Sequence, residues 1–188
     1  MFSIKKELEK LKDKSKEILF CSEEIDKEKQ ELRAKLENSF YEFIKYFYPV
    51  LEGRNDFQDG MHIHVIAEHL EECYYGNVRT LIINVPPGFM KTYICSIMFP
   101  AWCWTKDASS KFFCLSYSSK LSLKDSAQCR FLIRSEEYQE LWGDRFNIRR
   151  DSDAKGLFAN TTGGYRVSSS VGGAATGLRG GFVILDDP

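Results

Sequence analysis

Apolar residues recur at a seven-residue interval through the Lys- and Glu-rich stretch 3–36. The regular row consists of Ile4, Leu11, Ile18, Ile25 and Leu32. The companion row, four residues further on, is apolar only at its two ends, Leu8 and Leu36. One thin apolar stripe predicts a long helix, and it fits a weak coiled coil or an arm on another surface as well as a solvated helix with no partner. We therefore assign residues 1–37 to an N-terminal charged helix or arm.

A different pattern begins at residue 38, where helical apolar periods alternate with short runs of β-branched residues. Ser39 and Glu42 have the spacing of a capping box, and Pro49 is expected to end the helix that they begin. Further helices are expected at 61–75, 91–104, 120–134 and 136–142. Sheet strands are expected at 80–85, 112–117 and 181–185, and a hairpin at 158–170. This order predicts an α/β domain over residues 38–188.

The stretch 81–93 joins a β-branched apolar run, two prolines with a glycine, and the start of a helix. Free N–H groups and the positive end of the helix dipole favour an anion at such a helix start. Lys91 would add a cation for the β- and γ-phosphates, and the Thr92 hydroxyl would ligate Mg²⁺. The match to GxxxxGK[ST] is incomplete, since no glycine opens the motif and Met90 precedes the lysine. Taken alone, this stretch supports a phosphate site and an ordinary loop about equally.

A second nucleotide-related pattern lies at the other end of the chain. The apolar run 181–185 is followed directly by Asp186 and Asp187. Ligands of open parallel sheets bind at the carboxyl ends of the strands, so Asp186 is expected where phosphate-bound Mg²⁺ needs a negative oxygen. The alternative is a simple turn, because Asp-Asp-Pro is common turn chemistry. The two patterns together favour nucleotide binding.

Composition limits the partners that the chain can attract. The net charge is −1, from 26 basic and 27 acidic residues, so any contact with DNA needs a local positive patch. Six cysteines without a CxxC pair lie mostly within apolar patterns, which predicts reduced core thiols in a cytosolic protein rather than a zinc site or disulfides. The sequence has no apolar run of about 18 residues, and its N-terminus is too charged for a signal peptide.

Three further groups of residues could belong to a site, and the sequence favours them to different degrees. Gln58 and His62, just before the expected phosphate-loop strand, are candidates for contact with an adenine edge. The spacing of His62, His64 and His69 resembles no metal motif, so metal binding by the histidines is not expected. Arg179, in a glycine-rich loop before the last strand, either stabilises γ-phosphate charge in its own or a neighbouring subunit or is a solvated loop arginine.

Six sequence blocks in a fixed order carry a family resemblance over residues 56–188. They are 84–92 (Asn-Val-Pro-Pro-Gly-Phe-Met-Lys-Thr), 99–102, 116–118, 129–130 with 135–138, 160–161 with 164–166, and 176–177 through the Asp-Asp-Pro at 186–188. In these blocks the chain resembles the N-terminal ATPase part of the large subunit of tailed-bacteriophage terminases.

The resemblance implies a RecA-like P-loop ATPase fold of the additional-strand type, and a motor that uses ATP hydrolysis to drive double-stranded DNA into a procapsid. It implies that ATP is bound by the loop residues Pro87, Gly88, Phe89, Met90, Lys91 and Thr92. Thr92 and Asp186 would hold Mg²⁺. Asp187 stands where related ATPases place a water-activating glutamate, although its side chain is one methylene shorter. The implied partners are double-stranded DNA, a portal protein and a small terminase subunit, in the host-cell cytoplasm during phage assembly.

The chain also departs from this family. Additional-strand ATPases insert a later strand between the phosphate-loop strand and the Asp186 strand, and terminases add a nuclease domain; neither follows residue 188. We therefore expect an incomplete parallel sheet with flanking helices, belonging to a truncated protein or one completed by a second chain. Whether the isolated chain hydrolyses ATP stays open. The alternatives are a non-catalytic remnant or interaction module and, third, another P-loop ATPase such as a helicase.

Overall fold

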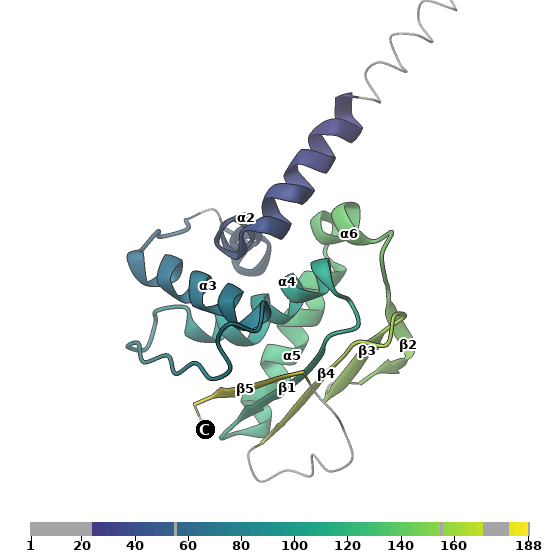
Figure 1. Cartoon of the computed structure of the whole chain (residues 1–188). Coiled ribbons are helices and arrows are strands. Elements are labelled where there is room, and N and C mark those ends of the chain that lie inside the picture. Colours follow the sequence, from purple (N-terminus) through teal and green to yellow (C-terminus); the bar gives the residue numbers. More distant parts are fainter. Residues whose placement is uncertain (1–23, 55, 155, 171–180, 188) are drawn as a thin grey trace, which may run out of the picture. The chain divides into compact units, whose positions relative to one another are not determined.

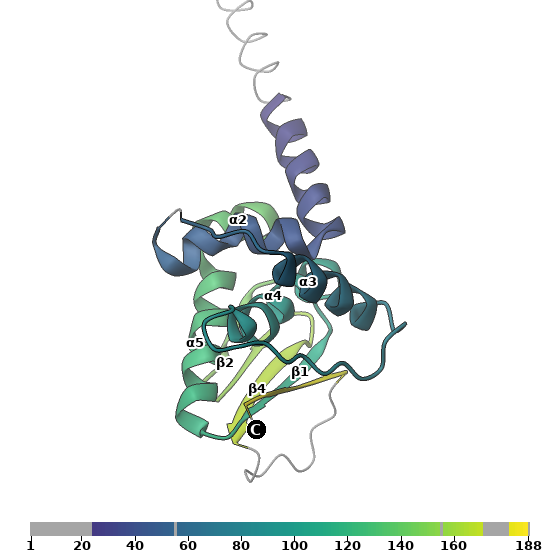
Figure 2. The same cartoon turned by 90° about the vertical axis from the view of Figure 1, so that its left-hand side faces the viewer.

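The structure, a computed structural model, describes residues 24–54, 56–154, 156–170 and 181–187 (Figures 1 and 2). The chain divides into two compact units, Met1–Lys35 and Leu36–Pro188. Residues 24–38 are helical, as the heptad pattern predicts, and residues 1–23 of that expected helix lie outside the described part. Ile25, a member of the apolar row, is 59% exposed within the smaller unit. No helix in the described ranges is long and apolar enough to cross a membrane.

The larger unit begins with helices that surround an aromatic core. Helix α2 (Phe40–Glu52) starts at the predicted cap, where the Ser39 hydroxyl accepts a hydrogen bond from the Glu42 N–H at 3.3 Å. The prediction that Pro49 ends this helix is wrong: the helix continues to Gly53, whose φ of 68° allows the left-handed cap. Proline removes only one N–H donor, so a helix with a buried apolar face tolerates it near its end.

Helix α3 (Met61–Tyr74) and helix α4 (Phe99–Lys106) follow, and the segment η1 (Tyr93–Met98) between them is π-helical. One helix was expected over 91–104, and the π-helical segment η1 was not predicted within it. Helices α5 (Ser119–Arg134) and α6 (Glu136–Trp142) complete the helical layer. Trp102 and Trp142 are fully buried, and their indole N–H groups donate to the Leu36 carbonyl at 3.0 Å and to the Glu37 carboxylate at 2.7 Å. These bonds satisfy the polar edges of two large apolar side chains.

In the described part of the chain the sheet has five strands, in the order β2-β3-β4-β1-β5. Its strands are β1 (Lys111–Ser116), β2 (Ile148–Asp153), β3 (Leu157–Asn160), β4 (Tyr165–Ser170) and β5 (Phe182–Asp186). β1 pairs in parallel with both β4 and β5, while β2, β3 and β4 pair antiparallel. The β3–β4 hairpin confirms the predicted one. The predicted parallel sheet is therefore wrong: the sheet is mixed, because the hairpin and β2 join it in antiparallel pairs, and β2 was not predicted.

One predicted strand is absent from this sheet. Residues 80–85 pair with no strand in the described ranges, although their side chains alternate between more and less exposed positions. In Figures 1 and 2 the segment lies on the β5 side of the domain. β5 is the edge strand, and its Val183 and Leu185 side chains are 64% and 56% exposed. A β-branched run becomes a sheet strand only when a neighbouring strand supplies hydrogen-bond partners. Among the described residues β5 pairs only with β1, so residues 80–85 lack those partners.

The helices cover one face of the sheet. Phe99 of α4 contacts the rings of Phe112 and Phe182, which are register partners on β1 and β5. Arg166 of β4 is in register with Phe112 and lies on the same face. Since β1, β4 and β5 are parallel, their carboxyl ends meet at one edge, where Asp186 ends β5.

Candidate functional site

The loop before Lys91 contains two residues with a left-handed backbone. Gly88 has a φ of 88° and Met90 a φ of 58°, so both are left-handed. Met90 occupies the position where the P-loop motif has glycine, and its carbonyl accepts the Ile94 N–H at 2.9 Å as the helix starts. A left-handed conformation costs an L-residue about 1–2 kcal/mol. The loop therefore keeps a glycine-like backbone without the glycine.

Lys91 brings the two ends of the candidate site together. Its Nζ lies 3.5 Å from Asp186 Oδ1 and forms an ion pair and hydrogen bond with Asp187, a residue 96 positions away in the chain. The hydrogen bond to Asp187 is the largest cause of a raised Lys91 pKa, and Asp186 adds to it. Lys91 is thus held protonated, which is the state that binds phosphate oxygens.

The two carboxylates differ in their surroundings. Asp186 is buried, and its Oδ2 lies 3.4 Å from the Ser96 hydroxyl, which donates to it. The Asp187 side chain is 77% exposed and its φ is 44°, again left-handed. The Asp187 carbonyl accepts the Tyr117 N–H at 3.0 Å, which fixes the backbone beyond β5. The Asp186 carboxylate is therefore fixed in position, whereas the exposed Asp187 side chain has room to move away from Lys91.

A cavity of about 520 Å³ lies against this loop. The sequence-predicted residues that line it are Pro87, Gly88, Phe89, Met90, Lys91, Thr92 and Asp187. Gln58 does not line it; the Gln58 amide instead donates to the Asp56 carbonyl at 3.3 Å. His62 is close to the loop, with its ring 4.9 Å from the Phe89 ring. Arg179 lies outside the described residues.

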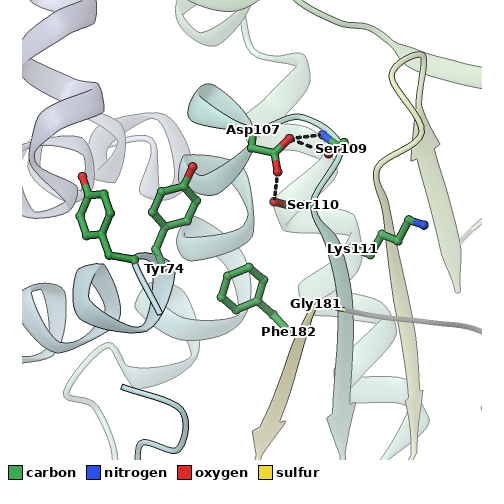
Figure 3. A pocket seen from close by; sticks show the side chains of 8 residues that line it. Tyr74, Asp107, Ser109, Ser110, Lys111, Gly181 and Phe182 are labelled. Carbon is green, nitrogen blue, oxygen red and sulfur yellow. Dashed lines mark hydrogen bonds between the residues drawn. The ribbon is translucent and has the colours of Figure 1, made fainter. Parts of the chain in front are cut away.

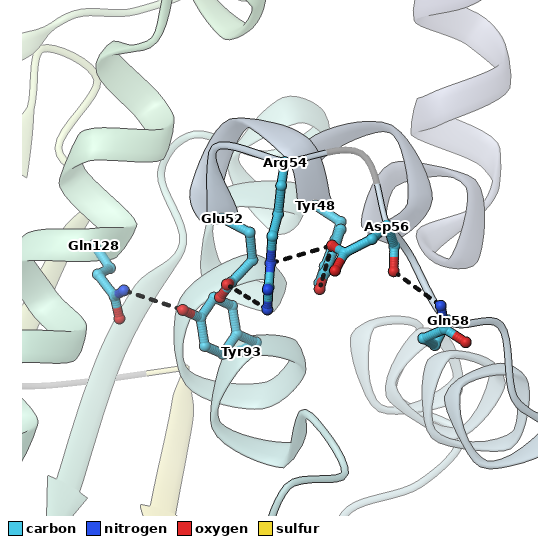
Figure 4. A network of polar contacts seen from close by, with 7 residues as sticks. All are labelled: Tyr48, Glu52, Arg54, Asp56, Gln58, Tyr93 and Gln128. Atoms are coloured by element: carbon cyan, nitrogen blue, oxygen red, sulfur yellow. Dashed lines mark hydrogen bonds and ion pairs between the residues drawn. The ribbon is translucent and has the colours of Figure 1, made fainter.

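The cavity is also lined by four residues that were not predicted as site residues: Tyr48, Glu52, Arg54 and Tyr93. Figure 4 shows the Arg54 side chain between Glu52 and Asp56, with guanidinium–carboxylate distances of 3.6 and 3.2 Å. Burial is the main cause of a raised Tyr93 pKa, and Glu52 raises it further. No motif marks these positions.

The residues present fit a magnesium ion only together with a phosphate. No group of three or more His, Cys, Asp or Glu side chains in the described ranges is arranged to hold a metal by itself. Mg²⁺ in nucleotide sites is usually held by one or two carboxylates and by phosphate oxygens. Asp186 and the Thr92 hydroxyl are the protein groups available for it here. His64 and His69 are engaged elsewhere, with Asp59 and with the Val65 carbonyl.

A second cavity, of about 610 Å³, lies at the amino ends of β1 and β5 (Figure 3). Its most polar group, the Asp107 carboxylate, accepts hydrogen bonds from the Ser109 N–H and hydroxyl at 2.9 and 2.6 Å and from the Ser110 hydroxyl at 3.1 Å. The Ser109 hydroxyl is the largest cause of a lowered Asp107 pKa. The smaller cavity is the better candidate for chemistry, because a lysine and two carboxylates from opposite ends of the domain's sequence meet beside it.

Comparisons with family models, with curated proteins and with solved structures found no match to this chain. The likeness to terminases therefore rests on the order of the sequence blocks.

Proposed function

We propose that the chain binds ATP and Mg²⁺ at the loop 87–92 and is the ATP-binding part of a terminase-like motor that drives double-stranded DNA into a procapsid. The observation that carries the proposal is the meeting of Lys91 with Asp186 and Asp187 at the carboxyl end of β5. Two half-specific sequence patterns, far apart in the chain, converge on one cavity. A RecA-like fold of the additional-strand type is part of the proposal.

The proposed roles follow from charge and position. Loop N–H groups and Lys91 bind the β- and γ-phosphates, and the Lys91 ammonium exchanges the Asp187 carboxylate for phosphate oxygens. Thr92 and Asp186 would hold Mg²⁺, which when bound would supply positive charge to the phosphates. Asp187, released from Lys91, is the candidate to orient the attacking water. Arg179 is proposed as the cation for γ-phosphate charge, in its own or a neighbouring subunit.

The motor function adds partners to this site. Double-stranded DNA, a portal protein and a small terminase subunit are proposed from the resemblance, with the host-cell cytoplasm as the place of assembly. A second chain or further segment that completes the sheet is proposed because β5 is paired on one side only, and because Val183 and Leu185 are exposed there. An unpaired apolar edge strand is a template for another strand.

A second candidate function is an interaction module with a vestigial nucleotide site. It is favoured by the closed Lys91–Asp187 pair, which satisfies the lysine without phosphate, and by the same open edge of β5. A helicase-type ATPase ranks third, because it would share the phosphate chemistry but leaves the intervening sequence blocks unexplained.

Calorimetric titration of the purified chain with ATP·Mg²⁺ tests the proposal. We expect binding by the unaltered chain and its loss in Lys91→Ala. Lys45→Ala is the matched control, since Lys45 is an exposed lysine on α2 and its removal changes the net charge equally. Equal binding by all three, or no binding by a chain with a cooperative unfolding transition, would reject the nucleotide site and favour the interaction module.

A further inference from the structure

Arg166 is a fully buried arginine in the middle of the domain. Its side chain is 0% exposed, and no carboxylate of the described residues lies within ion-pair distance of it. It donates instead to two neutral oxygens, the Ser168 hydroxyl and the Ser96 carbonyl, the latter at 3.0 Å. Its Nε has no hydrogen-bond partner among the residues that the structure describes. Burying a guanidinium without a paired carboxylate is costly, so stability alone does not explain this residue.

The contact with Ser96 has a cause in the sequence. Pro100 lies four residues after Ser96 and has no N–H, so it cannot donate the α-helical hydrogen bond to the Ser96 carbonyl. The helix is π-helical over this stretch, in η1 (Tyr93–Met98). Arg166 donates instead to the Ser96 carbonyl, which has no donor from Pro100. π-Helical turns within helices are frequent at functional sites.

Ser96 also contacts the candidate metal residue. While its carbonyl accepts from Arg166, its hydroxyl donates to Asp186 at 3.4 Å. One buried residue of the phosphate-loop helix therefore joins β4 to β5, two strands that are separated in the sheet by β1. The charge of Arg166 also reaches Asp125, whose pKa it lowers against the larger raising effect of burial. The buried cation thus lies among carboxylates without pairing directly with any of them.

We propose that Arg166, acting through Ser96, is a positioning residue for the Asp186 carboxylate. Arg166 and Ser96 together fix the helix that carries Lys91 and Thr92 against the strand that carries Asp186. They so set the distance between the Thr92 and Asp186 side chains, between which Mg²⁺ and the phosphates are proposed to bind. This inference rests on the proposed nucleotide site. It assigns no contact between Arg166 and the nucleotide.

Two serine variants separate positioning from packing. Ser96→Ala removes the hydroxyl that reaches Asp186 but keeps the carbonyl that Arg166 contacts. Ser168→Ala is the matched control, because it removes the other oxygen that Arg166 contacts, and its own hydroxyl makes no bond to Asp186. Both serines are buried and lose one hydroxyl each. Arg166→Met is the third variant; it removes the buried charge and keeps the apolar volume.

The readout is the gain in ATP affinity that Mg²⁺ provides, measured as the ratio of Kd in EDTA to Kd in Mg²⁺ by calorimetry. Ser96→Ala removes one hydrogen bond to Asp186, so we expect the magnesium gain to fall by about fivefold to tenfold in this variant. We expect a fall at least as large in Arg166→Met. Ser168→Ala should keep the gain within about twofold, even if its melting temperature falls.

A Ser96→Ala chain that unfolds at a lower temperature but keeps the full magnesium gain would overturn the proposal, because that result means a packing role alone. An unaltered chain that binds ATP without any magnesium gain would overturn it as well. Failure of the nucleotide site itself gives a different result, in which the unaltered chain binds neither ATP nor tripolyphosphate.

Discussion

Asp187→Asn should strengthen the binding of a phosphate chain while weakening any hydrolysis. In the structure the Asp187 carboxylate is paired with the Lys91 ammonium, so an incoming phosphate must displace the carboxylate. The pair joins a lysine that is 25% exposed to an aspartate that is 77% exposed, and exposed ion pairs contribute about 0.2–1 kcal/mol. Removing the competing charge should therefore tighten Kd for tripolyphosphate about twofold to fivefold.

The assay is calorimetric titration with tripolyphosphate, which has no base or ribose and reports the phosphate site alone. Asp151→Asn serves as the control for net charge, because Asp151 pairs with Arg149 on β2, at the opposite edge of the sheet from β5. The difference between the two variants should shrink as salt is raised, since salt screens an exposed pair. Unchanged or weaker binding by Asp187→Asn, relative to Asp151→Asn, would refute the competition between carboxylate and phosphate.

Three further outcomes follow from the structure. Met90→Gly should stabilise the chain by about 0.5–1 kcal/mol in urea unfolding, because relief of the left-handed strain exceeds the entropy that glycine adds to the unfolded state. Asn160→Ala should destabilise it by about 3 kcal/mol in the same assay, since the buried Asn160 amide donates to the Ala108 carbonyl at 2.7 Å and its oxygen accepts the Gly164 N–H at 2.9 Å. The lowered Asp107 pKa means that its contribution to stability is present above the unfolded pKa of about 3.9 and is lost as pH falls through the folded value. Ser109→Ala should therefore narrow the difference between the unfolding free energies at pH 6 and pH 3.

The sequence was most informative where local chemistry decides the structure. The Ser39 cap, the β3–β4 hairpin and the strand that ends in Asp186 were all predicted, because each depends on residues close together in the chain. The convergence of Lys91 with that strand was predicted through the rule that ligands gather at the carboxyl ends of parallel strands.

The sequence was least informative where the structure depends on distant partners. Residues 80–85 have the composition of a strand, but strand formation requires a neighbour, and none of the described strands pairs with them. The cavity wall that includes Tyr48 and Arg54 is set by how α2 packs, which no local motif reports. The link between Arg166 and Ser96 spans 70 residues and depends on a carbonyl that Pro100 leaves without its usual donor.

The most direct test of the phosphate site is a crystal structure of the chain with a non-hydrolysable ATP analogue and Mg²⁺. We expect the β- and γ-phosphates to lie against the loop 87–92, with Lys91 moved from Asp187 to phosphate oxygens and Mg²⁺ held by Asp186 and Thr92. A structure in which Lys91 keeps its pair with Asp187 and the nucleotide is absent, or is bound away from this loop, would refute the proposed phosphate site.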